Sequence, residues 1–164
     1  MTVTRKVAEM VTPDLATNVE TRIQEGHRIM VAARGITSVL GFALDEAQLR
    51  NATLYVLYVK EIVVFYARGP TVPGRPKWQE DPEAAAIMST MQKLGAERNV
   101  CVQPVYAVSE DAATTILDLT ATLGVDYLII GASQRTAMSK LLRGSVVTNV
   151  AQQLPESIHL IIYG

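Results

Sequence analysis

The feature that most constrains the fold is a regular alternation, from His27 onward, of short apolar runs with longer amphipathic segments. Apolar runs of this length favour β-strands, and segments whose apolar residues recur at every third or fourth position favour helices. The expected strands are Arg28–Ala33, Thr53–Val59, Val100–Tyr106, Tyr127–Ile130 and Ile158–Tyr163. The expected helices are Ser38–Arg50, Glu83–Arg98, a segment capped by Ser109 and closed by Gly124, and Val146–Gln153.

This order predicts an α/β fold with an open, doubly wound sheet of five parallel strands, because parallel neighbours need a helix to cross between them. Pro104 lies within the third strand and cannot donate a ladder hydrogen bond, so we place that strand at an edge of the sheet. The expected strand order is then 3-2-1-4-5. In such a sheet ligands bind beyond the carboxyl ends of strands one and four, where the chain reverses direction.

The composition favours one compact, soluble domain, residues 27–164, preceded by a polar tail or linker, residues 1–26. A formal net charge of −1 disfavours binding to nucleic acid. The longest purely apolar runs, Ile62–Ala67 among them, are too short to cross a bilayer, and the N-terminus lacks an apolar signal segment, so we expect no direct membrane insertion. The single cysteine, Cys101, excludes an intramolecular disulfide and favours a reducing compartment, so we expect a cytoplasmic location.

The segment Val125–Val150 carries the strongest indication of a binding site. An apolar strand ends at Gly131, a basic loop follows, and Gly144 and Ser145 precede the next helix. A glycine at a strand end lets a ligand approach the backbone, and unpaired amides at a helix N-terminus attract anions, so the pattern suits a polyphosphate. A second interpretation stays open, in which Gly131 only ends the strand, Gly144 follows a short helix, Met138–Arg143, and Ser145 caps the next helix.

At these residues the chain resembles the universal stress protein family, over nearly all of His27–Tyr163. The resemblance rests on the first strand IMVAARG, the second strand ATLYVLYV, and the helix and strand AATTILDLTATLGVDYLIIGAS. It rests also on a glycine pattern, since nucleotide-binding members have a Gly, two residues, a Gly, nine residues, and then Gly followed by Ser or Thr. Gly131, Gly144 and Ser145 match this pattern, whereas Gln134 replaces its second glycine.

The resemblance implies a flavodoxin-like or Rossmann-like fold, a stress-response or regulatory function, and a homodimer paired through the last strand, residues 158–163. It also implies ATP, AMP or a related adenine nucleotide, with or without magnesium, bound between strands one and four. By position, the backbone of Val59 would contact the adenine, while Gly131, Gly144, Ser145 and Val146 would hold the phosphates. The full set of candidate contact residues is Ala33, Arg34, Gly35, Val59, Gly131, Ala132, Gln134, Arg143, Gly144, Ser145 and Val146.

Two positions depart from the nucleotide-binding members of the family. Arg34 stands where those members usually have an acid, and it either contacts phosphate or ribose, or pairs with a carboxylate and fills the nucleoside site. The Gln134 amide can donate to a phosphate oxygen, but its Cβ would cost about 1 kcal/mol if the backbone there needs a positive φ. The cations Arg135, Lys140 and Arg143 suit either a phosphate or a solvated loop.

The sequence predicts neither a catalytic residue nor a metal site. No nucleophile has a base at a suitable spacing, so we expect a binding protein rather than an enzyme, with slow ATP hydrolysis left open. His27 and His159 have no third metal ligand in register. Trp78, in the proline-rich stretch Arg68–Pro82, either contacts a partner or packs against its own domain.

Two functions therefore compete. The first is a regulatory domain that binds an adenine nucleotide. The second is a homodimeric interaction module that has lost nucleotide binding and serves as a soluble appendage of a membrane transporter or kinase. The tail at residues 1–26 is the sequence feature that suggests this second function. The protein partner of either is unknown from the sequence.

Overall fold

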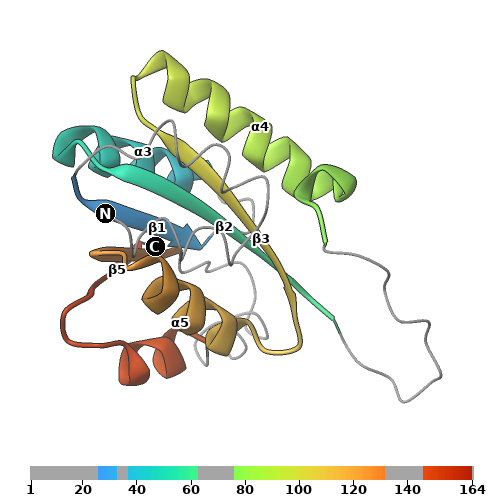
Figure 1. Cartoon of the computed structure of the whole chain (residues 1–164), viewed down its shortest axis with the longest axis vertical. Helices are drawn as coiled ribbons and strands as arrows, with labels where there is room; N and C mark the ends of the chain where they lie inside the picture. The colour runs from blue at the N-terminus through green and yellow to red at the C-terminus, as the bar shows by residue number, and fades with distance from the viewer. Residues whose placement is uncertain (1–25, 33–36, 63–75, 132–145, 164) are drawn as a thin grey trace.

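The computed structural model describes residues 26–32, 37–62, 76–131 and 146–163 (Figure 1). Its centre is a five-stranded sheet in the order β3-β2-β1-β4-β5, and every neighbouring pair is parallel. The strands are β1 (Arg28–Ala32), β2 (Thr53–Glu61), β3 (Val102–Ser109), β4 (Tyr127–Gly131) and β5 (His159–Tyr163). The predicted fold class and strand order are confirmed.

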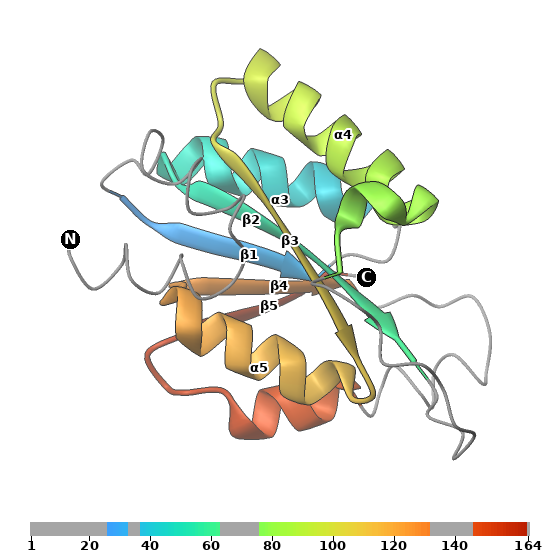
Figure 2. The ribbon, with the colours of Figure 1, turned by 45° about the vertical axis from the view of Figure 1, so that its right-hand side comes forward.

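Helices cover both faces of the sheet (Figures 1 and 2). Helices α3 (Thr37–Arg50) and α4 (Pro82–Glu97) lie on one face, which we call the α4 face. Helix α5 (Ala112–Leu123) and the helical residues 146–153 lie on the other, which we call the α5 face. A short 3-10 helix, η1 (Trp78–Glu80), precedes α4. The crossovers before β2 and β3 therefore use one face and those before β4 and β5 use the other, which makes the sheet doubly wound.

The central strands are apolar on both faces because each face is covered. In β1, Ile29 and Val31 are fully buried against the α4 face, while Met30 between them is fully buried against the α5 face. Successive side chains of a strand point to opposite sides, so a strand covered twice must be apolar throughout. This explains why the strand pattern is a continuous apolar run rather than an alternation.

Pro104 lies in β3 at the edge of the sheet, as predicted. The Leu54 N–H donates to the Cys101 carbonyl and the Ile62 N–H donates to the Ser109 carbonyl, so the odd-numbered residues of β3 direct their backbone groups at β2. Hydrogen-bonding direction alternates along a strand, and the even-numbered residues, Pro104 among them, therefore face outward. The missing N–H of Pro104 removes no bond from the sheet.

Several predicted boundaries differ from the structure, among them the start of β3, which is Val102 and not Val100, and two strand ends matter for the site. Strand β2 continues past Val59 to Glu61, and β3 runs to Ser109 instead of ending at Tyr106, because the two strands go on pairing with each other beyond the end of β1. Ser109 consequently belongs to the strand and does not cap α5. The N-cap is Asp111, whose side chain accepts from the Ala113 and Thr114 N–H groups.

Two other local predictions hold. Gly124 ends α5 in the left-handed region with φ 60°, a conformation that glycine adopts without steric cost. Trp78 packs, partly buried, against the hydrophobic cluster of the α4 face, as the intramolecular interpretation predicts.

Candidate ligand site at the carboxyl ends of β1 and β4

The strand order reverses between β1 and β4. The last pair in their register is Ala32 with Ile130, and one residue later β4 ends at Gly131. After β1 the chain passes to α3 on the α4 face, and after β4 it passes to residues 146–153 on the α5 face. The two connections thus diverge to opposite sides of the sheet, which is the arrangement at which doubly wound proteins bind ligands.

The structure describes three of the predicted contact residues, namely Val59, Gly131 and Val146. The other eight lie outside the described residues: Ala33, Arg34, Gly35, Ala132, Gln134, Arg143, Gly144 and Ser145. The cations Arg135 and Lys140 and the alternative short helix Met138–Arg143 lie there too. The alternatives for Arg34, Gln134 and Gly144 therefore stay predictions.

The backbone of Val59 faces the side of β2 on which β1 lies. The Thr53 N–H donates to the His27 carbonyl, so the odd-numbered residues of β2 direct their backbone groups toward β1. The register of β1 with β2 ends at Ala32 and Leu57, and Val59 lies two residues beyond it. Its side chain is only 7% exposed, in the core of the α5 face. Val59 therefore directs its N–H and carbonyl, and not its side chain, toward the region beyond the described end of β1.

Gly131 and Val146 mark the two ends of the undescribed connection after β4. Gly131 is the half-buried last residue of β4 and pairs with Tyr163 of β5. Val146 packs its side chain, partly buried, against the hydrophobic cluster of the α5 face. A contact between Val146 and a phosphate would therefore come from its backbone amide.

A polar network that sequence analysis missed lies beside this site, where β2 and β3 project past β1 as a two-stranded ribbon (Figure 2). Its centre is Asp81, the N-cap of α4, which is 7% exposed. Oδ2 of Asp81 accepts a 2.9 Å hydrogen bond from the Tyr106 hydroxyl and lies 3.2 Å from Nζ of Lys60. Oδ1 accepts from the N–H groups of Glu83 and Ala84 at 3.1 and 3.3 Å. One carboxylate thus joins β2, β3 and α4.

The network shifts the pKa values of its members. Burial alone would raise the pKa of Asp81, but the hydrogen bonds from Ala84, Tyr106 and Lys60 together hold it below its usual value. Burial, and then the bond to Asp81, raises the pKa of Tyr106 to about 12. Burial and the neighbouring Glu83 also raise the pKa of Tyr58, whose ring stacks on Tyr106 at a centroid distance of 5.9 Å. The carboxylate is therefore charged, and both phenols are neutral, near pH 7.

A local signal for this network existed in the sequence. Asp81, Pro82 and Glu83 form a helix start, since Asp caps well, Pro suits the first helical position and an acid complements the helix dipole. The bonds from Asp81 to Lys60 and Tyr106 had no such signal, because they join residues that only the tertiary structure brings together.

The family model described as "Universal stress protein family" matches residues 27–161. The chain belongs to the universal stress protein family. The match covers the whole sheet except the end of β5, and with it both sides of the reversal between β1 and β4. A comparison with curated proteins gave no match.

Solved universal stress proteins have the same fold. The protein from Archaeoglobus fulgidus in complex with dAMP is 20% identical, with a TM-score of 0.59 over 87% of this chain and 100% of that chain. UspA from Lactobacillus plantarum is 17% identical, with a TM-score of 0.63 over 84% and 97%. A family protein from Arabidopsis thaliana with AMP bound is 12% identical, with a TM-score of 0.54 over 84% and 92%. At these identities the likeness concerns the fold.

The described residues include no helix that is long and apolar enough to cross a membrane. Among them, no three His, Cys, Asp or Glu side chains are grouped so that they could hold a metal ion. His27 lies 3.6 Å from Asp126, and the His159 ring stacks on Tyr127 at 5.1 Å. The two histidines thus have a carboxylate and an aromatic ring as neighbours at the amino end of the sheet, away from the candidate site.

Proposed function

We propose that this universal stress protein domain binds an adenine nucleotide beyond the carboxyl ends of β1 and β4 and acts as a regulatory module of the cytoplasm rather than as a catalyst. The observation that carries the proposal is the reversal of strand order between β1 and β4, with the Val59 backbone directed at the space beyond β1. An N–H donor and a carbonyl acceptor on one strand edge complement the N1 acceptor and N6 donor of adenine.

The related structures support the class of ligand. The Archaeoglobus fulgidus protein holds dAMP and the Arabidopsis thaliana protein holds AMP. Gly131, Gly144 and Ser145 supply the residue types that a phosphate loop needs at the spacing of the nucleotide-binding members. We therefore propose AMP, ATP or a related adenine nucleotide, with magnesium where a triphosphate is bound.

Titration with AMP, dAMP and ATP with magnesium tests the proposal directly. A nucleotide at about a hundred times its dissociation constant should stabilise the protein by about 2.7 kcal/mol, which a thermal-shift or urea unfolding experiment detects. Arg143→Ala should weaken binding if this side chain contacts phosphate. Arg98→Ala is the matched control, since Arg98 pairs with Asp45 at the other end of the sheet. The absence of any stabilisation in the wild-type protein would contradict the proposal.

Two further variants test the alternatives for Arg34 and Gln134, the two positions that differ from the nucleotide-binding members of the family. Arg34→Asp restores the usual acid after strand one, and it should raise the affinity if Arg34 fills the nucleoside site, or lower it if Arg34 holds phosphate or ribose. Gln134→Gly restores the missing glycine, and tighter binding would show that the Gln134 side chain or its backbone strain weakens the site.

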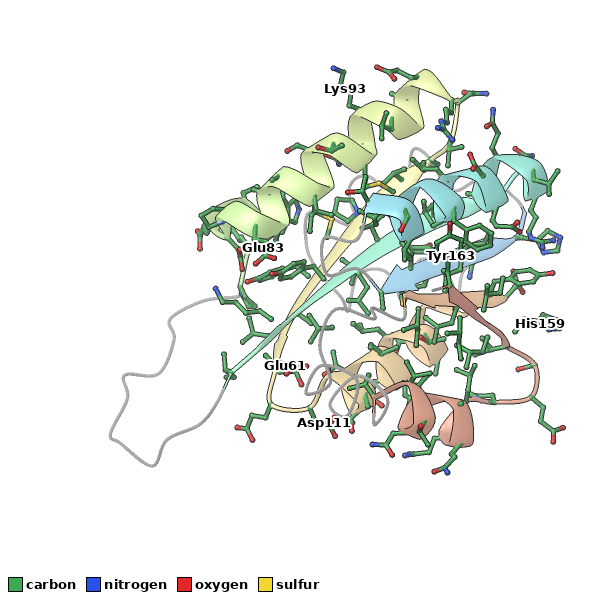
Figure 3. The ribbon with its side chains drawn as sticks, turned by 180° about the vertical axis from the view of Figure 1, so that it is seen from behind. Glu61, Glu83, Lys93, Asp111, His159 and Tyr163 are labelled. Atoms are coloured by element: carbon green, nitrogen blue, oxygen red, sulfur yellow. The ribbon has the colours of Figure 1, made fainter. Side chains whose placement is uncertain are left out.

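We also propose that two copies of the chain pair through β5. This strand forms an edge of the sheet, and its Ile162 side chain is 51% exposed. An unpaired apolar edge invites aggregation, and pairing with the same strand of a second copy would cover it with two-fold symmetry. The other edge of β5 pairs with β4, and the Tyr163 ring, labelled in Figure 3, stacks on Phe42 of α3 with the ring centroids 4.7 Å apart.

The second candidate function is a homodimeric interaction module without nucleotide binding, such as an appendage of a transporter or kinase. Arg34 and Gln134 favour it, because both replace residue types that the nucleotide-binding members carry. Mass spectrometry of the denatured, freshly purified protein separates the two candidates. A nucleotide retained through purification supports the first function and counts against the second.

A further inference from the structure

We propose that Asp81 is a positioning residue for the nucleotide site: through Lys60 and Tyr106 it holds the projecting end of β2, and with it the Val59 backbone that would contact the base. This inference rests on the proposed function. The structural basis of the inference is the ribbon formed by the ends of β2 and β3.

The ribbon needs support from outside the sheet. Past Leu57, β2 has no further partner in the described part of β1, and its pairs from Tyr58–Tyr106 to Glu61–Ser109 join it to β3 alone. Up to Val59 the ribbon is buried in the cores of the two faces, whereas Lys60 and Glu61 at its end are exposed, and a pair of strands without such cover is marginally stable in water at best. A ligand site built on the edge of such a ribbon would be loose unless another element fixed it.

Asp81 supplies that support from α4. Its Oδ2 atom meets one group from each strand of the ribbon, the Lys60 ammonium at 3.2 Å and the Tyr106 hydroxyl at 2.9 Å. The side chain of Asp81 is 8% exposed and that of Lys60 is 53% exposed, so the shared charge lies at the boundary of the core. Hydrogen bonds to a charged group are stronger than neutral ones, and a half-buried pair is less screened than a surface pair.

The ion pair between Lys60 and Asp81 restrains the backbone of the preceding residue, Val59. The backbone groups of Lys60 face β3, as the parity of the strand requires, while its side chain reaches Asp81 on the α4 face. The next peptide group back along the chain, that of Val59, faces the opposite way, toward the space beyond β1. With Lys60 fixed on two sides, the Val59 N–H and carbonyl have a defined direction before any ligand arrives.

Mutation can separate the two roles of Asp81, which caps α4 and also binds Lys60 and Tyr106 of the ribbon. Asp81→Asn keeps an oxygen for the Glu83 and Ala84 N–H groups, and Asn caps helices about as well as Asp. It removes the charge that attracts Lys60 and the second oxygen that accepts from Tyr106. Lys60→Met removes the same ion pair from the other side. Asp111→Asn is the matched control, since Asp111 caps α5 by the same geometry and none of its contacts in the described structure reaches β2.

The experiment measures affinity for AMP by isothermal titration and for ribose 5-phosphate by displacement of AMP, in the full chain. We expect Asp81→Asn and Lys60→Met each to weaken AMP roughly 2- to 30-fold and to leave ribose 5-phosphate nearly unchanged, because only AMP presents the base to Val59. The double variant should bind no more weakly than Asp81→Asn alone, because Lys60→Met removes an ion pair that Asp81→Asn has already removed. Amide hydrogen exchange of the peptide containing Val59 should quicken in both variants and not in Asp111→Asn.

Each possible outcome has a defined consequence. Wild-type protein that binds no AMP overturns the proposed function and this inference together. Wild-type protein that binds AMP, with Asp81→Asn binding it equally well, overturns the inference alone. An equal loss for AMP and ribose 5-phosphate also overturns it, because Asp81 would then support the fold in general and not the edge that meets the base.

Discussion

The hydroxyl of Tyr106 donates a 2.9 Å hydrogen bond to the carboxylate of Asp81, and it thereby joins the projecting end of β3 to the first turn of α4. Because Tyr106 is 9% exposed and its partner is an anion, its proton is held more tightly in the folded protein than in the unfolded chain. The same bond therefore predicts how stability changes in alkali.

Stability should fall between pH 10 and about pH 12, the folded-state pKa of Tyr106. Within this window the unfolded chain loses the phenolic proton and the folded protein keeps it, so a rise in pH favours unfolding by up to about 1.4 kcal/mol per pH unit for this residue. Urea unfolding from pH 9 to 12 measures the slope. Tyr106→Phe should show a shallower slope than the wild type, and an identical slope would refute the assignment.

Thr53→Val should stabilise the protein by about 1 kcal/mol. Thr53 is 1% exposed, and its hydroxyl is the one buried side-chain oxygen or nitrogen atom without a hydrogen-bond partner among the described residues. Valine has nearly the same shape and removes the unsatisfied group, and it also suits a strand. Urea or thermal unfolding gives the change in free energy.

The control for this variant is Thr120→Val, at a hydroxyl that is buried and satisfied. Thr120 is fully buried in α5, and its hydroxyl donates to the Ile116 carbonyl at 2.5 Å. Its removal should cost about 0.5–1.5 kcal/mol, the net value of one hydrogen bond. Changes of the same sign in the two variants would mean that the environment of Thr53 is not as described.

Gly95→Ala should destabilise the protein, by up to about 2 kcal/mol. Gly95 is buried in α4, and a Cβ there would clash with Val102 of β3 and lie 2.8 Å from the Val100 carbonyl. Overpacking costs about 1–3 kcal/mol, and the roughly 1 kcal/mol that alanine gains over glycine within a helix offsets only part of it, because one of the close contacts is to backbone. Denaturant unfolding of the variant measures the difference.

Gly41→Ala is the matched change in α3 and should have the opposite sign. A Cβ at Gly41 meets nothing within 4 Å, so only the helix propensity changes and the protein should gain about 0.5–1 kcal/mol. Equal effects at the two glycines would show that close packing of α4 on β3 does not decide the cost at Gly95.

Ile162→Glu should convert the proposed homodimer into a monomer, because a charge on the edge strand opposes its pairing with a second copy. Light scattering after size-exclusion chromatography measures the mass. Leu49→Glu is the control, since Leu49 is more exposed, at 78% against 51% for Ile162, but lies on α3. A wild-type protein that is monomeric at tens of micromolar, or an Ile162→Glu variant that remains a dimer, would contradict pairing through β5.

Local sequence signals were sufficient where one element decides the outcome. The apolar run of β4 predicted a strand covered on both faces, Pro104 predicted an edge strand, and Gly124 predicted the end of α5. Boundaries that depend on a neighbouring element were not predictable in this way. The local sequence predicts that Ser109 caps a helix, whereas its pairing with Glu61 keeps it in β3.

The sequence by itself determined the order of strands and helices through its periodicity, the strand order 3-2-1-4-5 through their alternation with Pro104 at an edge, and the family through motifs that each lie within one chain segment. Only the tertiary structure decided that β2 and β3 extend past the described end of β1 and that the Val59 backbone faces the region beyond it. It also decided that Asp81 joins Lys60 to Tyr106. Those relationships unite residues distant in the chain. Their geometry depends on the relative lengths of neighbouring strands and on where a helix starts above them, which no local pattern encodes.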